Sequence, residues 1–485
     1  PSWRRVGGAA AQAPSWRWLL AVGAFCTLAS AVGVGARATY GAQTTADEPQ
    51  YLLTALSVAE DGDLDIADEL AARRWRAFHA AQLPEQTRPL PGRRRLSPHD
   101  PLLPLLLALP VALGGWVGAK LALAATAGVL GAMLLWTAVR RFGVAVPTAA
   151  VAVGVFGASA PLAVYGTQVY PELPAAVAVT IAIAAGTGPL RRPGIWLLAG
   201  AIVALPWLAV KYAPVAAVLA GVAVVRLWRA DRRGAAAGFA AGLAAAGVVF
   251  LVLHQSTYGG WTPYAAGDHF VGGELTVVGS HPNFLGRSQR LAGLLVGRSF
   301  GIAAWQPAWL LAVPALAALA RARPPGWLVL ALPLTAGWLN ATFVALTAQG
   351  YWFPGRQVVV VLPCAVLAVA WWADRLRAGR PLAALGALGV LAYGWLVVEA
   401  STGRLTVVVD FFRTANPLYR AWRRLLPDYA SPDAWTWPLH GVWVVVLLAV
   451  AVWGWRAGRH STVNSACMPS AKCTMSSSTM LQNRT

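Results

Sequence analysis

Long apolar stretches, separated by short basic or long polar segments, recur along the whole chain. Each stretch is long enough to cross about 30 Å of hydrocarbon as a helix. They cover about residues 15–36, 117–138, 146–165, 172–187, 194–210, 212–228, 235–253, 300–320, 326–347, 357–373, 381–398 and 439–455. This pattern predicts an all-α polytopic membrane protein with about 12 transmembrane helices, in a range of 11 to 13.

The connections between these stretches alternate in length and charge. Every second connection is short and basic, and by the positive-inside rule it faces the cytoplasm. The basic connections include Arg140, Arg191, Arg232 and Arg377. The alternate connections include three long outer loops, at 37–116, 254–298 and 399–438. Nearly all the acidic residues then lie outside, since only Asp231 and Asp374 of 19 fall in a cytoplasmic connection.

The first outer loop is predicted to carry juxtamembrane helices. Asp47 and the following Glu-Pro indicate a helix from Asp47 to about Gly62, and Asp65 caps a second, amphipathic helix from Ile66 to about Gln82. The apolar run Pro101–Leu113 resembles another crossing. Because the number of crossings before the basic Arg140 must be odd, we interpret this run as a short helix at the outer interface.

The composition supports a membrane protein. Of the 485 residues 57% are hydrophobic and 12% charged, about half the charge of a soluble domain. The net charge of +20 comes from arginines in cytoplasmic loops, so it does not indicate nucleic-acid binding. The four cysteines have no paired spacing and predict neither a zinc site nor a disulfide. Residues 1–460 form one transmembrane domain, and the Ser/Thr-rich tail at 461–485 is predicted to be disordered.

Two interpretations of the Asp47–Glu48 pair stay open on local grounds. The Asp47 carboxylate is suited to capping the following helix, since aspartate at that position accepts from free backbone N–H groups. Alternatively, a carboxylate at the membrane boundary is suited to take a proton from a hydroxyl. The second interpretation gains weight from the other polar residues on the same side.

The segment that follows resembles a calcium-binding loop, with acids at Asp61, Asp63 and Asp65. The turn glycine of such loops is replaced by Ile66, and Ala72 stands where a bidentate glutamate is required. We therefore predict no metal ligands from the sequence, although a divalent cation stays open as a cofactor.

Further acids stand where outer loops meet apolar stretches. His99 and Asp100 close the first outer loop, directly before Pro101. Glu172 begins an apolar stretch after a very short outer connection that contains Tyr170. An acid at a helix start is also stabilised by the helix dipole, so Glu172 has a structural interpretation as well.

Isolated cations occur on the same outer side, against the overall charge bias. Lys211 lies between two apolar stretches, where a lysine is costly unless it reaches water or meets an anion. Arg356 and its neighbour Tyr351 lie in the outer connection between two later stretches. We predict that Lys211 and Arg356 hold a lipid phosphate.

These motifs, in this order and on one side, resemble those of GT-C type membrane glycosyltransferases. Protein O-mannosyltransferases and aminoarabinose lipid transferases are the nearest relatives, and actinobacterial members are most similar in composition. The resemblance implies that Asp47 is the catalytic acid position, Glu48 its partner and Glu172 the acid of the second outer loop. The family's His-Pro-Pro-Leu motif is here His99-Asp100-Pro101-Leu102. Such enzymes use polyprenyl-phosphate sugars and invert the anomeric centre.

The expected function is transfer of one sugar from a polyprenyl phosphate to an acceptor hydroxyl on the non-cytoplasmic face of the plasma membrane, with Asp47 as general base. The acceptor is a glycan, a lipid or a protein, and the sugar is a hexose or a pentose. The alternative is a transporter or flippase of a lipid-linked glycan, which predicts acids within the crossings. The sequence places its acids at one face instead.

Overall fold

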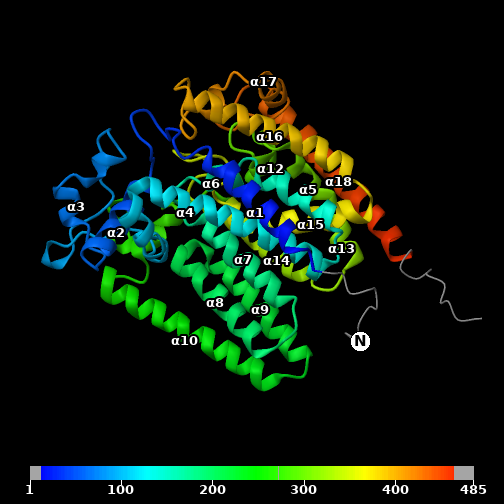
Figure 1. The fold of residues 1–485 in the computed structure, drawn as a ribbon, viewed down its shortest axis with the longest axis horizontal. Coiled ribbons are helices and arrows are strands. Elements are labelled where there is room, and N and C mark those ends of the chain that lie inside the picture. Colours follow the sequence, from blue (N-terminus) through cyan, green and yellow to red (C-terminus); the bar gives the residue numbers. More distant parts are fainter. Residues whose placement is uncertain (1–12, 271, 464–485) are drawn as a thin grey trace, which may run out of the picture.

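The computed structural model describes residues 13–270 and 272–463, and within these ranges the fold is helical (Figure 1). The described residues contain no strand, only isolated β-bridges such as Ala42 with His79. The longer helices are α1 (Trp16–Ala31), α2 (Glu48–Glu60), α4 (Leu102–Phe142), α5 (Val146–Gly157), α7 (Glu172–Gly186), α8 (Arg192–Leu208), α9 (Ala213–Arg229), α10 (Arg233–Tyr258), α13 (Ala312–Ala322), α14 (Trp327–Leu339), α15 (Leu362–Arg375), α16 (Gly379–Ser401) and α18 (Thr436–Val463).

A helix lies in each predicted apolar stretch. Within the described residues, six helical segments are long and apolar enough to cross a membrane, and five shorter ones are apolar. The six are Leu102–Phe142, Val210–Arg229, Arg233–Ala266, Trp327–Val344, Gly379–Ser401 and Thr436–Gly458. A polytopic integral membrane protein is therefore confirmed in outline, and the exact number of crossings stays a prediction. Helix α18 continues to Val463, so the predicted tail begins as helix; from residue 464 it lies outside the described residues.

The segment 37–116, predicted to be the first outer loop, agrees with the prediction in its first helix and differs in its second. Helix α2 begins after Asp47 and ends at Glu60, as expected. The predicted helix from Ile66 to Gln82 is wrong: α3 (Ala67–Ala71) is one short helix, and Arg73 then adopts a left-handed φ of 55°. The chain turns there so that Phe78 accepts a hydrogen bond from the Gln43 amide. This tertiary pairing overrides the amphipathic pattern.

The run after Pro101 forms a separate arm of α4. Gly114 and Gly115 leave the helical conformation, and Gly115 has a φ of 57°, which favours glycine. The chain doubles back so closely that a Cβ on Gly118 would lie 2.1 Å from the Pro110 carbonyl oxygen. Residues 102–113 therefore precede the main helix as a short helix of their own, and its place at the membrane interface stays a prediction.

Packing brings distant helix ends together. Helix α4 packs on α1, α2 and α7, and α7 also packs on α8. In Figure 1, α2 and α3 lie at one end of the molecule, while α8, α9 and α10 lie side by side along one edge. The starts of α2 and α7, the short 3-10 helix η3 (Val210–Tyr212) and the loop before η10 (Val359–Val361) meet at one point. That point is the candidate site.

Candidate active site

Four charged side chains from four separate segments form one ion-pair network. Arg356 donates from Nη2 to Asp47 Oδ2 at 2.6 Å and from Nε to Glu172 Oε1 at 3.1 Å. Lys211 Nζ donates to the same Glu172 oxygen at 2.7 Å. Two carboxylates thus share two cations. The structure brings together the acids and the cations that the sequence singled out from different loops.

The start of α2 shows which interpretation of Asp47 holds. Asp47 occupies the N-cap position, yet its carboxylate accepts no hydrogen bond from the helix backbone. The amides of Gln50 and Tyr51 donate hydrogen bonds to the backbone carbonyl of Asp47, not to its side chain. The capping interpretation is therefore wrong, and the carboxylate points to Arg356 instead.

The four side chains of the network differ in how much of their surface is exposed to solvent. The side chains of Asp47 and Lys211 are 23% and 22% exposed, whereas Arg356 is 8% exposed and Glu172 is completely buried. Burial alone would raise the pKa of Asp47, but the Arg356 guanidinium holds that pKa well below its usual range. Asp47 is therefore an ionised carboxylate that a second molecule can reach.

Glu48 follows Asp47 but points elsewhere and is completely buried. Its Oε2 accepts from the Val169 amide at 2.9 Å and its Oε1 from the Thr45 amide at 3.4 Å. Burial raises the pKa of Glu48 to about 7, against the opposing charge of Lys120. The Glu48 carboxylate ties α2 to the short connection before α7, and no part of it is exposed to a substrate.

Lys120 is a site residue that the sequence analysis missed. It is 3% exposed, and its Nζ donates to the Gln43 carbonyl at 2.6 Å. The chain has only three lysines, and Lys120 is isolated in an apolar stretch as Lys211 is. The argument that identified Lys211 therefore also applies to Lys120.

Aromatic rings hold the Arg356 guanidinium in place. The guanidinium carbon lies 4.0 Å from the Tyr170 ring centre and 5.0 Å from that of Trp352. Tyr170 in turn donates its hydroxyl to the Thr45 carbonyl at 3.2 Å. Tyr351, predicted to bind substrate, is 67% exposed, so Trp352 and not Tyr351 covers the guanidinium.

His99 lies at the edge of the network. Its ring stacks on Tyr51 with centres 4.6 Å apart, and its Nε2 lies 3.3 Å from Gln86 Oε1. Burial lowers the pKa of His99 to about 4, so the imidazole is neutral at neutral pH.

Asp100 supports the backbone that carries Lys211. Its Oδ2 accepts from the Val210 amide at 2.8 Å, and its Oδ1 lies 3.3 Å from His254 Nε2. Burial raises the pKa of this carboxyl. Asp100 is therefore a positioning residue, and His254, which the sequence analysis missed, is its buried partner.

An apolar groove of about 860 Å³ lies between α4, α7 and α8. Its walls include Leu103, Leu107 and Val177. Its lining reaches Pro174, two residues after Glu172, and Leu208, three residues before Lys211. The two cations of the network are suited to an anion, and the groove beside them is suited to an alkyl chain.

Comparison with solved structures identifies the architecture. ArnT from Cupriavidus metallidurans bound to undecaprenyl phosphate aligns with a TM-score of 0.52 over 93% of this chain and 74% of ArnT, at 16% identity. The apo state of ArnT gives a TM-score of 0.50 over 93% of this chain and 73% of ArnT, at 17% identity. This chain has the GT-C fold. The resemblance inferred from the sequence motifs is thereby confirmed at the level of the fold.

No protein-family model and no curated protein sequence matches this chain. At 16–17% identity the GT-C likeness concerns the architecture, and the roles of individual residues must be argued from their own geometry.

Proposed function

We propose that the protein transfers a sugar from a polyprenyl phosphate to an acceptor hydroxyl on the non-cytoplasmic face of the membrane. The observation that carries this proposal is the partly exposed Asp47 carboxylate paired with Arg356, in one ion-pair network with Lys211. The GT-C fold, shared with a protein whose structure contains undecaprenyl phosphate, supports the same class of donor.

The two cations hold the donor phosphate. Lys211 and Arg356 both contact Glu172 Oε1, so their charges converge on one place, where a phosphate oxygen competes with the carboxylates. Completely buried Glu172 keeps the two cations together. When phosphate engages Arg356, the guanidinium has less contact with Asp47. Donor binding thereby frees the carboxylate for chemistry.

The polyprenyl chain lies in the groove between α4, α7 and α8. The groove is lined mainly by leucine and alanine side chains, which bury an alkyl chain without loss of hydrogen bonds. Because the groove lining includes Pro174 and Leu208, close in sequence to Glu172 and Lys211, we expect a phosphate at the end of such a chain to reach the cations.

Asp47 acts as the general base. The acceptor hydroxyl gives its proton to the Asp47 carboxylate as its oxygen forms a bond to the anomeric carbon. The bond from that carbon to the phosphate oxygen breaks, and polyprenyl phosphate leaves with the electron pair. Attack opposite the leaving group inverts the anomeric centre. Among Asp47, Glu48 and Glu172, only Asp47 has an exposed side chain, so the other two hold the site together.

The remaining candidate residues position this machinery. Tyr170 stacks on the phosphate-binding Arg356, and Asp100 fixes the backbone before Lys211. His99, neutral and next to the network, is placed to donate a hydrogen bond to substrate.

The test is transfer by purified protein with the lipid donor identified by mass spectrometry of co-purified material. Asp47→Asn keeps the size of the side chain but cannot take the proton, so we expect a folded, donor-binding protein with transfer reduced about 100-fold or more. Glu85→Gln, at an exposed acid of the same loop, is the matched control and keeps full activity.

Near-normal transfer by Asp47→Asn would remove Asp47 from the mechanism and make Glu172 the next candidate. A co-purified lipid that carries no sugar phosphate, with no transfer from added polyprenyl-phosphate sugars, would contradict the proposed function itself.

A further inference from the structure

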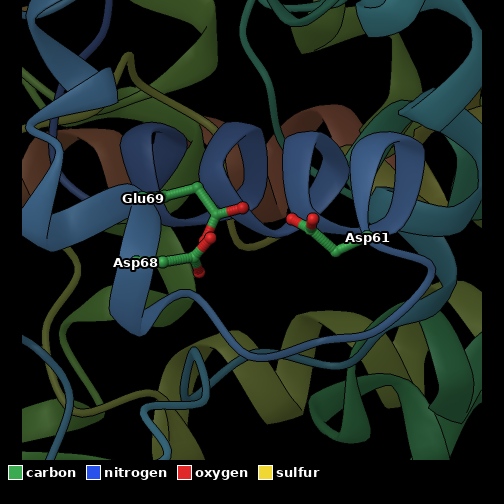
Figure 2. Close-up of side chains that lie close together, drawn as sticks. All are labelled: Asp61, Asp68 and Glu69. Carbon is green, nitrogen blue, oxygen red and sulfur yellow. The ribbon is translucent and has the colours of Figure 1, made fainter.

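A second polar group lies in the first outer loop, at the opposite end of α2 from Asp47. Asp61, at the end of α2, and Asp68 and Glu69, on α3, each offer an oxygen, and these oxygens lie within 4.8 Å of one another. Figure 2 shows the three carboxylates turned toward a common space between the two helices. Asp61 and Asp68 are exposed, whereas Glu69 is buried.

The loop between α2 and α3 brings these three acids together. The two acids within the loop, Asp63 and Asp65, instead accept hydrogen bonds that hold the loop in place. Asp63 Oδ1 accepts from the Ser57 hydroxyl and the Asp65 amide. Asp65 Oδ1 accepts from the amides of Ala67 and Arg95. The acids that fold the loop are therefore separate from those that face the common space. The sequence analysis rejected Asp61, Asp63 and Asp65 as a calcium loop, and the acids whose oxygens come together in the fold are a different set.

Glu69 has a buried carboxylate oxygen that lacks a hydrogen-bond partner, and this points to a missing ligand. This residue is only 2% exposed, and its Oε2 is buried without a hydrogen-bond partner in the structure. A buried carboxylate oxygen without a donor is strongly disfavoured unless a cation or a proton meets it. In Figure 2 the Glu69 carboxylate lies between Asp68 and Asp61.

In the described part of the chain, Asp61, Asp68 and Glu69 form no direct ion pair with a lysine or arginine, although the charge of the nearby Arg74 acts on Asp68. The nearby Arg74 uses its guanidinium in a bidentate contact with Glu60, at 2.9 and 2.7 Å. Either a proton held between Asp68 and Glu69 or a bound cation therefore balances this charge.

We propose that Asp61, Asp68 and Glu69 bind one Ca²⁺ ion. Carboxylate oxygens are the ligands of hard cations, and Ca²⁺–oxygen bonds of about 2.3–2.6 Å place ligands up to about 5 Å apart. The observed oxygens fit within that span. The two exposed carboxylates leave room for water to complete the coordination sphere. The negative end of the α2 dipole, at Asp61, also favours a cation.

Such an ion would fasten α3 to the end of α2. Since α2 carries Asp47 and Glu48 at its other end, the ion would stiffen the element that presents the catalytic carboxylate. The ion itself lies about four helical turns from Asp47 and takes no part in the chemistry. The inference is therefore independent of which reaction the protein performs.

The test measures cation binding to the full-length protein purified in detergent and stripped with chelator. We expect one Ca²⁺ per chain by calorimetric titration with CaCl₂, with a dissociation constant of about 10⁻⁴–10⁻³ M, typical of extracellular calcium modules. Millimolar CaCl₂ should raise the midpoint of thermal unfolding by about 2–4 °C, and MgCl₂ should have a smaller effect.

The double variant Asp61→Asn/Asp68→Asn should bind Ca²⁺ at least about tenfold more weakly and lose the thermal shift. Glu69→Gln should do the same and serves if the double variant fails to fold. Asp63→Asn is the matched control, because asparagine can still accept the loop hydrogen bonds. It should bind Ca²⁺ as the parent does.

Three outcomes would overturn the proposal. The first is no Ca²⁺ binding by the parent at 5 mM, roughly five times the weakest expected dissociation constant, which would show that a shared proton balances the charge. The second is binding by both the double variant and Glu69→Gln that equals binding by the parent. The third is loss of binding in Asp63→Asn alone, which would move the site to the sequential loop.

Discussion

The ion pair between Asp47 and Arg356 can be tested by a double-mutant cycle on the free energy of unfolding. The cycle compares the parent with Asp47→Asn, Arg356→Met and the double variant. Arg356→Met leaves completely buried Glu172 with Lys211 as its only cation, so it should cost about 3–5 kcal/mol. Asp47→Asn should cost less, about 1 kcal/mol, since Glu172 still holds Arg356.

The magnitude of the coupling follows from the geometry. Nη2 and Oδ2 are 2.6 Å apart, and two unit charges about 4 Å apart interact by about 4 kcal/mol at an effective dielectric constant of 20. Desolvation of the 8% exposed Arg356 offsets part of this attraction. We therefore expect a coupling energy of about 1.5–3 kcal/mol, with the double variant costing less than the sum of the single variants.

The assay is unfolding in mixed micelles by a denaturing detergent, followed by far-UV circular dichroism. The control cycle uses Glu60 and Arg74, an arginine–carboxylate pair of the same loop whose side chains are 46% and 43% exposed. That pair should couple by only about 0.2–1 kcal/mol. Equal coupling in the two cycles, or additivity within about 0.5 kcal/mol at Asp47 and Arg356, would refute the network described above.

Three further predictions concern pH, donor binding and sidedness. The pKa of His99 is about 4 in the folded protein against about 6.5 in the unfolded chain, so the free energy of unfolding should fall as the pH drops from 6.5 to 4. His99→Gln should flatten this pH dependence, and an unchanged slope in that variant would contradict the prediction. In lipid titrations, Lys211→Met should bind polyprenyl phosphate about tenfold more weakly than the parent, whereas Lys211→Arg should retain binding. Equal binding by all three proteins would exclude Lys211 as a phosphate-binding residue. On a cysteine-free background, His99→Cys should react with an impermeant thiol reagent from outside and Arg140→Cys should not; labelling of both from one side would refute the topology.

The fold was largely predictable because the membrane constrains it strongly. Apolar length and the alternation of basic loops located the helices, and the odd number of crossings identified residues 102–113 as a separate arm. The second helix of the first outer loop was mispredicted, because local amphipathicity there competes with pairing between Phe78 and Gln43. Such pairing links residues whose proximity no local pattern indicates.

The four charged members of the ion-pair network were predictable from the sequence, but their pairing was not, and Lys120 and His254 were missed. Charge at a membrane boundary is costly, so Asp47, Glu172, Lys211 and Arg356 could be identified as exceptional. Which acid pairs with which cation depends on how the helix ends meet. That Trp352 lies over the Arg356 guanidinium was not predictable, because adjacent residues in an irregular loop offer no periodicity to show which side chain faces inward.

The span of the Asp47–Arg356 contact has a consequence for biosynthesis. These residues are 309 positions apart, whereas Glu172 and Lys211 are only 39 apart. At about 5–20 residues per second, a ribosome needs roughly 15–60 s to travel from the first partner to the last. During that interval Asp47 has been synthesised, but Arg356, which supplies its guanidinium partner, has not. The ion-pair network is therefore completed late in translation, and a chain that ends before Arg356 inserts helices but does not assemble the network.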